Sequence, residues 1–156
     1  MKRLAAVRIR GEINIKPDIK ETLKSLKLYK KNYCIVVPSN PTYTGMLQKA
    51  KDYITFGELN EKTFAVLLEK RGRITNKKRL TEDYLKKEAK TDLKTFAKDF
   101  MSAKKELKDV PGLKKFFKLH PPIGGFERKG IKKPYSIGGV LGYRKEKIND
   151  LILKMI

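Results

Sequence analysis

Three short apolar runs, separated by two amphipathic stretches, constrain how this chain can fold more than any other feature of its sequence. The runs cover residues 4–9, 33–37 and 54–57. Each is too short for a helix, and the first alternates in the period of two that a half-buried strand shows, with Ala5, Val7 and Ile9 on one face. The sequence therefore predicts three β-strands within the first 58 residues.

The two intervening stretches carry apolar residues at helical spacing. Pro17 suits the first turn of a helix, and Ile19, Leu23 and Leu26 recur every three or four positions, which predicts a helix to about residue 28. A second apolar stripe runs through residues 46–53. Residues 1–58 thus read as a β-α-β-α-β core domain with both helices on one sheet face, because each element has one apolar side to bury. The opposite face is then available for a partner.

Residues 59–156 are predicted to form a helical and loop-rich extension. Asn60, Thr81 and Thr91 are candidate helix N-caps, and Gly72 is a candidate left-handed glycine that ends the first of these helices. From 110 to 143 the periodicity disappears among Pro and Gly pairs, so this segment is expected to be a loop whose shape is set by its contacts.

The last residues, 146–156, again show helical spacing. One face of the expected helix is apolar and the other is charged. The apolar face covers either the core of the protein itself or an adjacent protein, and both alternatives stay open. Its residues are Ile148, Leu151, Ile152 and Met155.

The charge of the chain limits its partners. It has 38 Lys and Arg residues against 17 Asp and Glu, a formal charge of +21, which repels itself in a compact state and attracts phosphate backbones. Nucleic acid is the expected partner. A membrane surface is a weaker alternative, because no run approaches the length of a spanning helix and the basic residues do not gather on one amphipathic stretch. The N-terminus lacks the apolar core of a signal peptide, so a cytoplasmic protein is expected.

Catalysis is not expected, since the chain has one His and one Cys, and its carboxylates are scattered among basic residues. Cys34 is the single cysteine, so no cysteine metal cluster is possible within one chain. Because it lies inside an apolar run, it is predicted to be a buried, inert thiol. Glycine patterns that hold nucleotide phosphates are absent after the strands, so no cofactor is predicted. The rival hypothesis, an RNA-processing enzyme, would need Asp109, His120 or Glu127 as an acid-base group.

Two segments are the strongest candidates for RNA binding. Residues 70–80 hold six basic residues and no acidic one, and residues 124–135 combine glycines with four cations and two aromatic rings. Cations can neutralise phosphates, aromatic rings can stack on unpaired bases, and glycines allow close approach of the main chain. The alternative is that both segments are solvated surface. The full set expected to bind RNA is Arg8, Arg10, Tyr43, Thr44, Arg71, Arg73, Lys77, Lys78, Arg79, Lys114, Lys115, His120, Phe126, Arg128, Lys129, Lys132, Lys133, Tyr135 and Arg144.

Several motifs together resemble one family. They are residues 4–11, 41–47 and 53–57, followed by a C-terminal block at 109–114, 119–122, 124–132 and 138–144. On these residues the chain resembles, over nearly its whole length, the archaeal and eukaryotic form of the universal large-subunit ribosomal protein usually called L-thirty. The bacterial form resembles residues 1–58 alone. The eukaryotic basic N-terminal extension has no counterpart here, which favours an archaeal member.

The resemblance implies an α+β fold, in which a three-stranded antiparallel sheet carries two helices on one face, somewhat like a ferredoxin fold, with a helical and extended C-terminal addition. It also implies a structural constituent of the large ribosomal subunit that binds folded ribosomal RNA near the small RNA of that subunit, beside other ribosomal proteins. The alternative within RNA-binding proteins is a free-standing RNA-binding protein or RNA chaperone.

Overall fold

A computed structural model describes residues 2–75 and 78–156. The strands and longer helices follow the predicted order through the first 58 residues and then continue as three further helices, two short strands and a terminal helix. In chain order they are β1 (Arg3–Arg8), α1 (Pro17–Ser25), β2 (Tyr33–Pro38), α2 (Pro41–Lys49), β3 (Ile54–Glu58), α3 (Glu61–Arg71), α4 (Glu82–Glu88), α5 (Leu93–Met101), β4 (Phe116–Lys118), β5 (Gly142–Tyr143) and α6 (Ile148–Met155), with short 3₁₀ helices η1 (Leu107–Asp109), η2 (Tyr135–Ile137) and η3 (Lys145–Lys147). The fold is thus mixed α+β, as predicted.

The sheet is larger than the three strands expected. Its order is β4-β2-β1-β3-β5. β1 pairs antiparallel with β2 and β3, β4 is antiparallel to β2, and β5 is parallel to β3. The prediction was wrong because β4 and β5 are too short to show an alternating pattern. They are recruited by the unpaired backbone groups at the two edges of the central strands.

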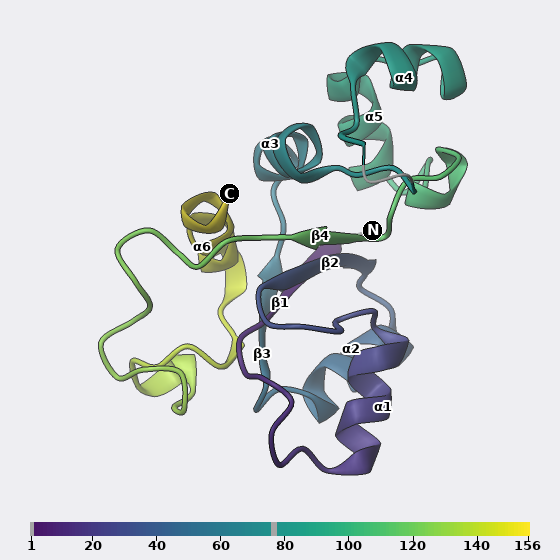
Figure 1. Ribbon diagram of the computed structural model, residues 1–156. Helices are drawn as coiled ribbons and strands as arrows, with labels where there is room; N and C mark the ends of the chain where they lie inside the picture. The colour runs from purple at the N-terminus through teal and green to yellow at the C-terminus, as the bar shows by residue number, and fades with distance from the viewer. Residues whose placement is uncertain (1, 76–77) are drawn as a thin grey trace.

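One face of the sheet packs against α1 and α2, as predicted (Figure 1). The two helices end earlier than expected, because Leu26 and Ala50 already cap them. Lys27 takes a positive φ of 60°, and this turn lets the Leu28 N–H donate to the Leu23 carbonyl and returns Leu28 to the core. The buried residues of this first cluster are Leu4, Ala6, Leu23, Leu26, Leu28, Ile35, Val37, Leu47, Ala50, Ile54 and Phe56.

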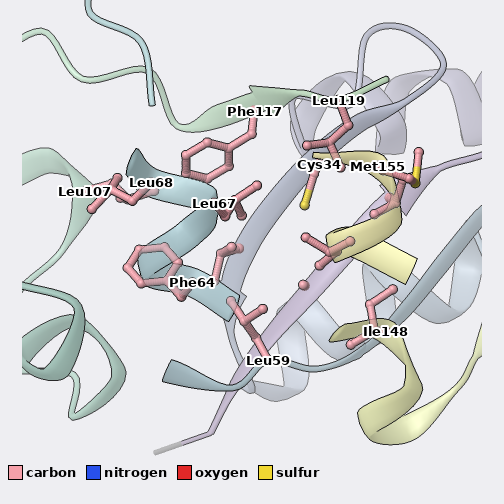
Figure 2. Close-up of a cluster of buried hydrophobic side chains, with 14 of the residues drawn as sticks. Cys34, Leu59, Phe64, Leu67, Leu68, Leu107, Phe117, Leu119, Ile148 and Met155 are labelled. Atoms are coloured by element: carbon pink, nitrogen blue, oxygen red, sulfur yellow. The ribbon is translucent and has the colours of Figure 1, made fainter. Parts of the chain in front are cut away.

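The opposite sheet face is not free, so that prediction was wrong. Ala5, Val7, Ile9, Cys34 and Val36 belong to a second buried cluster, which also contains residues of α3, α5, β4 and α6 (Figure 2). The reason is that the helices of the extension have apolar faces of their own, and the sheet is the apolar surface that covers them.

The apolar face of the terminal helix α6 covers the protein's own core. Ile148, Leu151, Ile152 and Met155 are all buried in the second cluster. Because this cluster joins the first 58 residues to the extension, a boundary at residue 58 would cut through it. The division into two domains stays a prediction.

Aromatic packing joins α3 to α5, and the single thiol confirms a smaller expectation. Phe64 of α3 and Phe100 of α5 are buried and stacked, with ring centroids 4.4 Å apart. Cys34 is fully buried, and burial raises the pKa of its thiol to about 12. The thiol therefore stays protonated and inert at neutral pH, as predicted.

The ends of α3 differ from the prediction. Gly72 has φ −59° and is not left-handed. A Cβ there would overlap the carbonyl oxygen of Leu68, so glycine is required by close packing and not by backbone conformation. Asn60 stands at the N-cap position without a side-chain cap bond. Its backbone N–H donates instead to Oδ1 of Asn149 in α6, at 2.9 Å.

The two threonine caps have different outcomes. The Thr81 hydroxyl accepts a hydrogen bond from the Tyr84 N–H at 3.4 Å, as predicted for the start of α4. The N-cap residue of α5 is Asp92, while Thr91 donates its hydroxyl to the carbonyl of Ala89. The second cap prediction was therefore wrong by one residue.

Gly57 of β3 allows α6 to approach the sheet. A Cβ at this position would overlap the backbone carbonyl of Lys145 and press on Ile148. We expect Gly57→Ala to lower the free energy of unfolding by about 2 kcal/mol in urea titrations, since the obstructing atom is backbone and cannot move alone. The matched control is Gly45→Ala in α2, where no atom lies within 4 Å and a gain of about 0.5–1 kcal/mol is expected. Equal effects of the two changes would contradict this account.

Candidate nucleic-acid interface

Arg8, one of the predicted RNA-binding arginines, is buried at 3% exposure. Its Nη1 donates to the carbonyls of Leu28 and Tyr29 at 2.7 and 2.8 Å, and its Nε donates to that of Arg10 at 3.0 Å. Burial lowers the pKa of Arg8, an effect that the nearby Glu12 carboxylate opposes. The guanidinium satisfies loop carbonyls at the end of β1 and so has a structural role, while its contact with RNA stays a prediction. β1 is central and covered on both faces, which alternation alone did not predict.

Arg144 is also buried, at 3% exposure, and each nitrogen of its guanidinium donates a hydrogen bond to an acceptor of the protein. Nη1 forms an ion pair with Glu127 at 2.7 Å, and Nε donates to the Thr55 hydroxyl at 2.7 Å. Nη2 donates to the Val140 carbonyl at 2.9 Å, and the guanidinium carbon lies 4.7 Å from the centre of the Tyr135 ring. Arg144 thus attaches the C-terminal loop to β3, and its contact with RNA stays a prediction.

The loop of residues 124–143, which we call the C-terminal loop, takes its shape from contacts inside the chain. The Tyr135 N–H donates to the Leu141 carbonyl at 2.8 Å, and the Val140 N–H donates to the Lys133 carbonyl at 2.9 Å. A Cβ at Gly139 would overlap that same carbonyl of Lys133. Phe126 packs against the second cluster, and Arg144 lies over one face of the Tyr135 ring. Both predicted stacking residues are therefore at least partly used by the protein itself.

Four cations of the C-terminal loop remain exposed. Their side chains belong to Arg128, Lys129, Lys132 and Lys133. Within residues 2–75 and 78–156, none of the four makes an ion pair with a carboxylate. The structure thus presents four unneutralised positive charges on a backbone that is already ordered by internal hydrogen bonds.

The basic segment at residues 70–80 turns back on itself. Arg73 and Arg79 form an isolated antiparallel bridge, and the Ile74 N–H donates to the Lys78 carbonyl at 2.9 Å. Lys78 and Arg79 are exposed, whereas Lys77 lies outside the described residues. Arg71 is half-buried and donates through Nη2 to the backbone oxygen of Ile156. Its pKa is lowered by burial and then by the charges of Arg73 and Arg79.

A second cationic surface forms where this segment meets β4. The Lys114 N–H donates to the Arg73 carbonyl at 2.9 Å, and both residues line a cavity of about 250 Å³ with Phe116 and Lys118. Residues 114, 116 and 118 alternate along the strand and so share one side of it. The sequence predicted Arg73 and Lys114 separately, and the structure brings them together.

Aromatic rings support this surface. Phe116 stacks on Tyr33 with centroids 5.1 Å apart, and Tyr29 meets the edge of Phe116 at 5.9 Å. The ammonium groups of Lys114 and Lys118 lie 5.9 and 5.7 Å from the ring centres of Phe116 and Tyr33. Phe116 and Lys118 were not among the predicted binding residues. Their alternation with Lys114 in a basic, aromatic stretch was the available signal.

The remaining predicted residues are dispersed. Tyr43 and Lys115 line one cavity of about 350 Å³ beside β2, and Thr44 is half-buried in α2. The His120 side chain is exposed, and the backbone N–H of His120 donates to the Met155 carbonyl at 2.9 Å. Their roles in RNA binding stay predictions.

Arg10 joins a cavity that sequence reasoning did not find. It lies with Lys132 around a space of about 440 Å³ that also includes Lys16, Lys51 and Tyr53. Lys16, Lys51 and Tyr53 were missed because each stands alone in a different segment, with no local pattern around it. Only the folded chain brings them together.

Residues 2–75 and 78–156 hold neither a candidate metal site nor a helix that could span a membrane. No group of three or more His, Cys, Asp and Glu residues there could hold a metal ion. None of the helices found there has the length and apolar character needed to cross a membrane.

Comparisons with known proteins agree with the resemblance drawn from the motifs. The family model described as Ribosomal protein L30p/L7e matches residues 4–54. The chain is 49% identical to the large ribosomal subunit protein uL30 of Nanoarchaeum equitans over 97% of both chains. It is 46% identical to that of Methanopyrus kandleri, over 95% of this chain and 100% of the relative, and 47% identical to that of Methanococcus vannielii, over 97% and 98%. The chain therefore belongs to the uL30 family of large-subunit ribosomal proteins.

Proposed function

We propose that this chain is a structural component of the large ribosomal subunit that binds and stabilises folded ribosomal RNA. The main support for this mode of binding is a set of four exposed cations, without ion pairs among the described residues, on the internally ordered C-terminal loop: Arg128, Lys129, Lys132 and Lys133. A loop that is ordered before binding loses less conformational entropy when it meets RNA. The proposed contacts are to phosphates and to the shape of the RNA.

The surface formed by Arg73, Lys114, Phe116 and Lys118 is proposed as a second contact. Cations held beside aromatic rings suit a backbone with nearby unpaired bases. Following the family resemblance, we place the site near the small ribosomal RNA of the large subunit, with neighbouring ribosomal proteins around it.

Catalysis has no place in this proposal. The family is one of structural ribosomal proteins, which is not an enzyme class. Of the three residues that the enzyme hypothesis needs, Glu127 accepts the ion pair of Arg144, and Asp109 Oδ2 accepts the Glu106 N–H at 2.7 Å. These carboxylates hold the structure together, and we propose no acid-base role for them or for His120.

Sedimentation separates a ribosomal component from a free-standing RNA-binding protein. Extracts in high salt are resolved on a gradient, and the chain is detected in each fraction. We expect it in the large-subunit fraction, since contacts distributed over several surfaces dissociate slowly. Recovery only as free protein would contradict the proposal.

Salt dependence of binding tests the C-terminal loop. Glutamine replaces Arg128, Lys129, Lys132 and Lys133 together, and binding to protein-free archaeal large-subunit RNA is measured from low to high salt. We expect weaker binding and a slope of log affinity against log salt that flattens by about 0.9 per lost phosphate contact on a duplex. The loop's internal bonds are untouched, so folding should be unchanged.

The matched control for this variant removes the same charge elsewhere. Glutamine replaces four exposed lysines at or just after α4 and α5, which lie far from the C-terminal loop (Figure 1): Lys87, Lys94, Lys98 and Lys104. The control should keep most of the wild-type slope. An equal loss in both variants would mean that net charge, and not this loop, governs binding.

A further inference from the structure

A cavity of about 440 Å³ opens between the first part of the chain and the C-terminal loop. Segments far apart in the sequence form it: the β1–α1 loop and α1, the turn between α2 and β3, and residues 132–142. Its lining residues are Arg10, Lys16, Ile19, Lys51, Asp52, Tyr53, Lys132, Pro134, Leu141 and Gly142. We call it the lysine cavity.

Its charge is strongly positive. Lys16, Lys51 and Lys132 are exposed, and in the described part of the chain none of them makes an ion pair. Asp52 is the one carboxylate among the lining residues. Three free ammonium groups from three segments, converging on one space, form an environment that favours phosphate.

Arg10 is held in place within the lysine cavity. Its guanidinium carbon lies 5.1 Å from the centre of the Tyr53 ring, and Nη1 donates to the Asp52 carbonyl at 3.4 Å. The backbone is fixed as well, since the N–H groups of Ile9 and Arg10 both donate to the Tyr53 carbonyl, at 3.0 and 3.2 Å. The guanidinium plane is thus oriented before any ligand arrives.

The remaining lining residues are apolar. Leu141 is buried, Ile19 is half-buried, and Pro134 is exposed beside them. Gly142 has φ +84°, and a Cβ there would meet no atom within 4 Å, so space is left open at this point. A cavity of this volume lies within the range of about 300–1,000 Å³ that small-molecule sites occupy.

We infer that the lysine cavity receives one unpaired nucleotide of the bound RNA. The base packs against Ile19, Pro134 and Leu141, while Lys16, Lys51 and Lys132 neutralise the phosphates on either side. An apolar wall beside convergent cations suits an unstacked base with its sugar-phosphate, whereas a paired base stays inside its helix and cannot enter. The inference rests on the proposed function and gives it a specific point of contact.

Cross-linking tests whether one nucleotide occupies the cavity. A photoreactive phenylalanine analogue replaces Asp52 or Pro134 in the full chain, each variant is bound to protein-free archaeal large-subunit RNA, and the cross-linked nucleotide is mapped. Both positions should cross-link to the same unpaired nucleotide, and the same probe at Lys87 on α4 should not. Cross-links to distant or base-paired nucleotides would overturn the inference.

A charge variant provides the second test. Lys16, Lys51 and Lys132 are changed together to glutamine and compared with the triple change of Lys87, Lys94 and Lys98. We expect the cavity variant to bind at least tenfold more weakly and to flatten the salt slope by about 1.4 units, at about 0.7 for each of the two phosphates that flank the nucleotide on a single strand. The control should keep most of the slope.

The outcomes separate this inference from the proposed function. If the wild-type chain binds the RNA and the two triple variants behave alike, the lysine cavity is not a nucleotide site. If the wild-type chain does not bind the RNA, the proposed function fails, and the inference fails with it. Adenosine or uridine monophosphate competing as strongly as the RNA itself would identify a free nucleotide as the ligand and overturn the assignment to RNA.

Discussion

Replacing Arg144 with alanine is expected to lower the free energy of unfolding by about 3 kcal/mol, near the lower end for breaking a buried ion pair. Arg144 is 3% exposed, and its guanidinium donates to Glu127, Thr55 and the Val140 carbonyl. Its removal leaves the Thr55 hydroxyl and the Val140 carbonyl without this donor. The Glu127 side chain is 30% exposed, so water can partly solvate its carboxylate, and for this reason the lower end applies.

The same substitution should also loosen the C-terminal loop. Thr55 is in β3, while Glu127 and Val140 belong to the loop, so Arg144 joins the two. We expect faster amide hydrogen exchange across residues 124–143, together with the lower midpoint in urea. Both can be measured on one sample.

Arg128→Ala is the matched control. Arg128 is an exposed arginine of the same loop, so its effect on stability should fall within about 0.5 kcal/mol of zero. Its effect on RNA binding should instead appear in the salt slope. Unfolding of the two alanine variants at the same urea concentration would contradict the stabilising role of Arg144.

A fragment of residues 1–60 is expected to associate with itself in solution. It would expose a face formed by Ala5, Val7, Ile9, Cys34 and Val36, which in the full chain packs against α3 and α6 (Figure 2). Exposed apolar patches of this kind drive association. We expect size-exclusion chromatography to show oligomers or aggregates, and a dye that binds exposed apolar surface to fluoresce.

The reactivity of the Cys34 thiol tests whether this face is exposed in the fragment. In the full chain, burial raises the pKa of its thiol to about 12, so at pH 8 it is protonated, covered and unreactive toward a thiol reagent. In the fragment the thiol is uncovered and its pKa returns toward about 8.5, so the thiolate becomes populated and reactive. A monomeric fragment with an unreactive Cys34 would instead support an independent domain that ends near residue 58.

This fragment also tests the part of the chain that the family model matches. That model matches residues 4–54, whereas the second sheet face is apolar and is covered by the extension. If the fragment associates as expected, the sheet of this chain depends on residues 59–156 for its cover.

The local order of residues could be predicted from the sequence because periodicity is a local property. Alternation at 4–9 and the short apolar runs at 33–37 and 54–57 correspond to β1, β2 and β3. The stripe of Ile148, Leu151, Ile152 and Met155 corresponds to α6 and its buried face. The motifs of the C-terminal block also carried the family resemblance, which the relatives confirm.

The tertiary structure alone decided which cations are exposed to a partner and which of them lie close together. Arg8 and Arg144 look like Arg10 and Arg128 in the sequence, yet their guanidinium groups satisfy buried oxygens of distant segments. The Arg144–Thr55 bond spans 89 residues, and the lysine cavity joins residues 10–19, 51–53 and 132–142, so no local pattern contains them. The sequence by itself determined β1, β2 and β3, the amphipathic helices and a polyanionic partner. The burial of individual charges depends on packing between distant segments, and for that reason it became visible only in the folded chain.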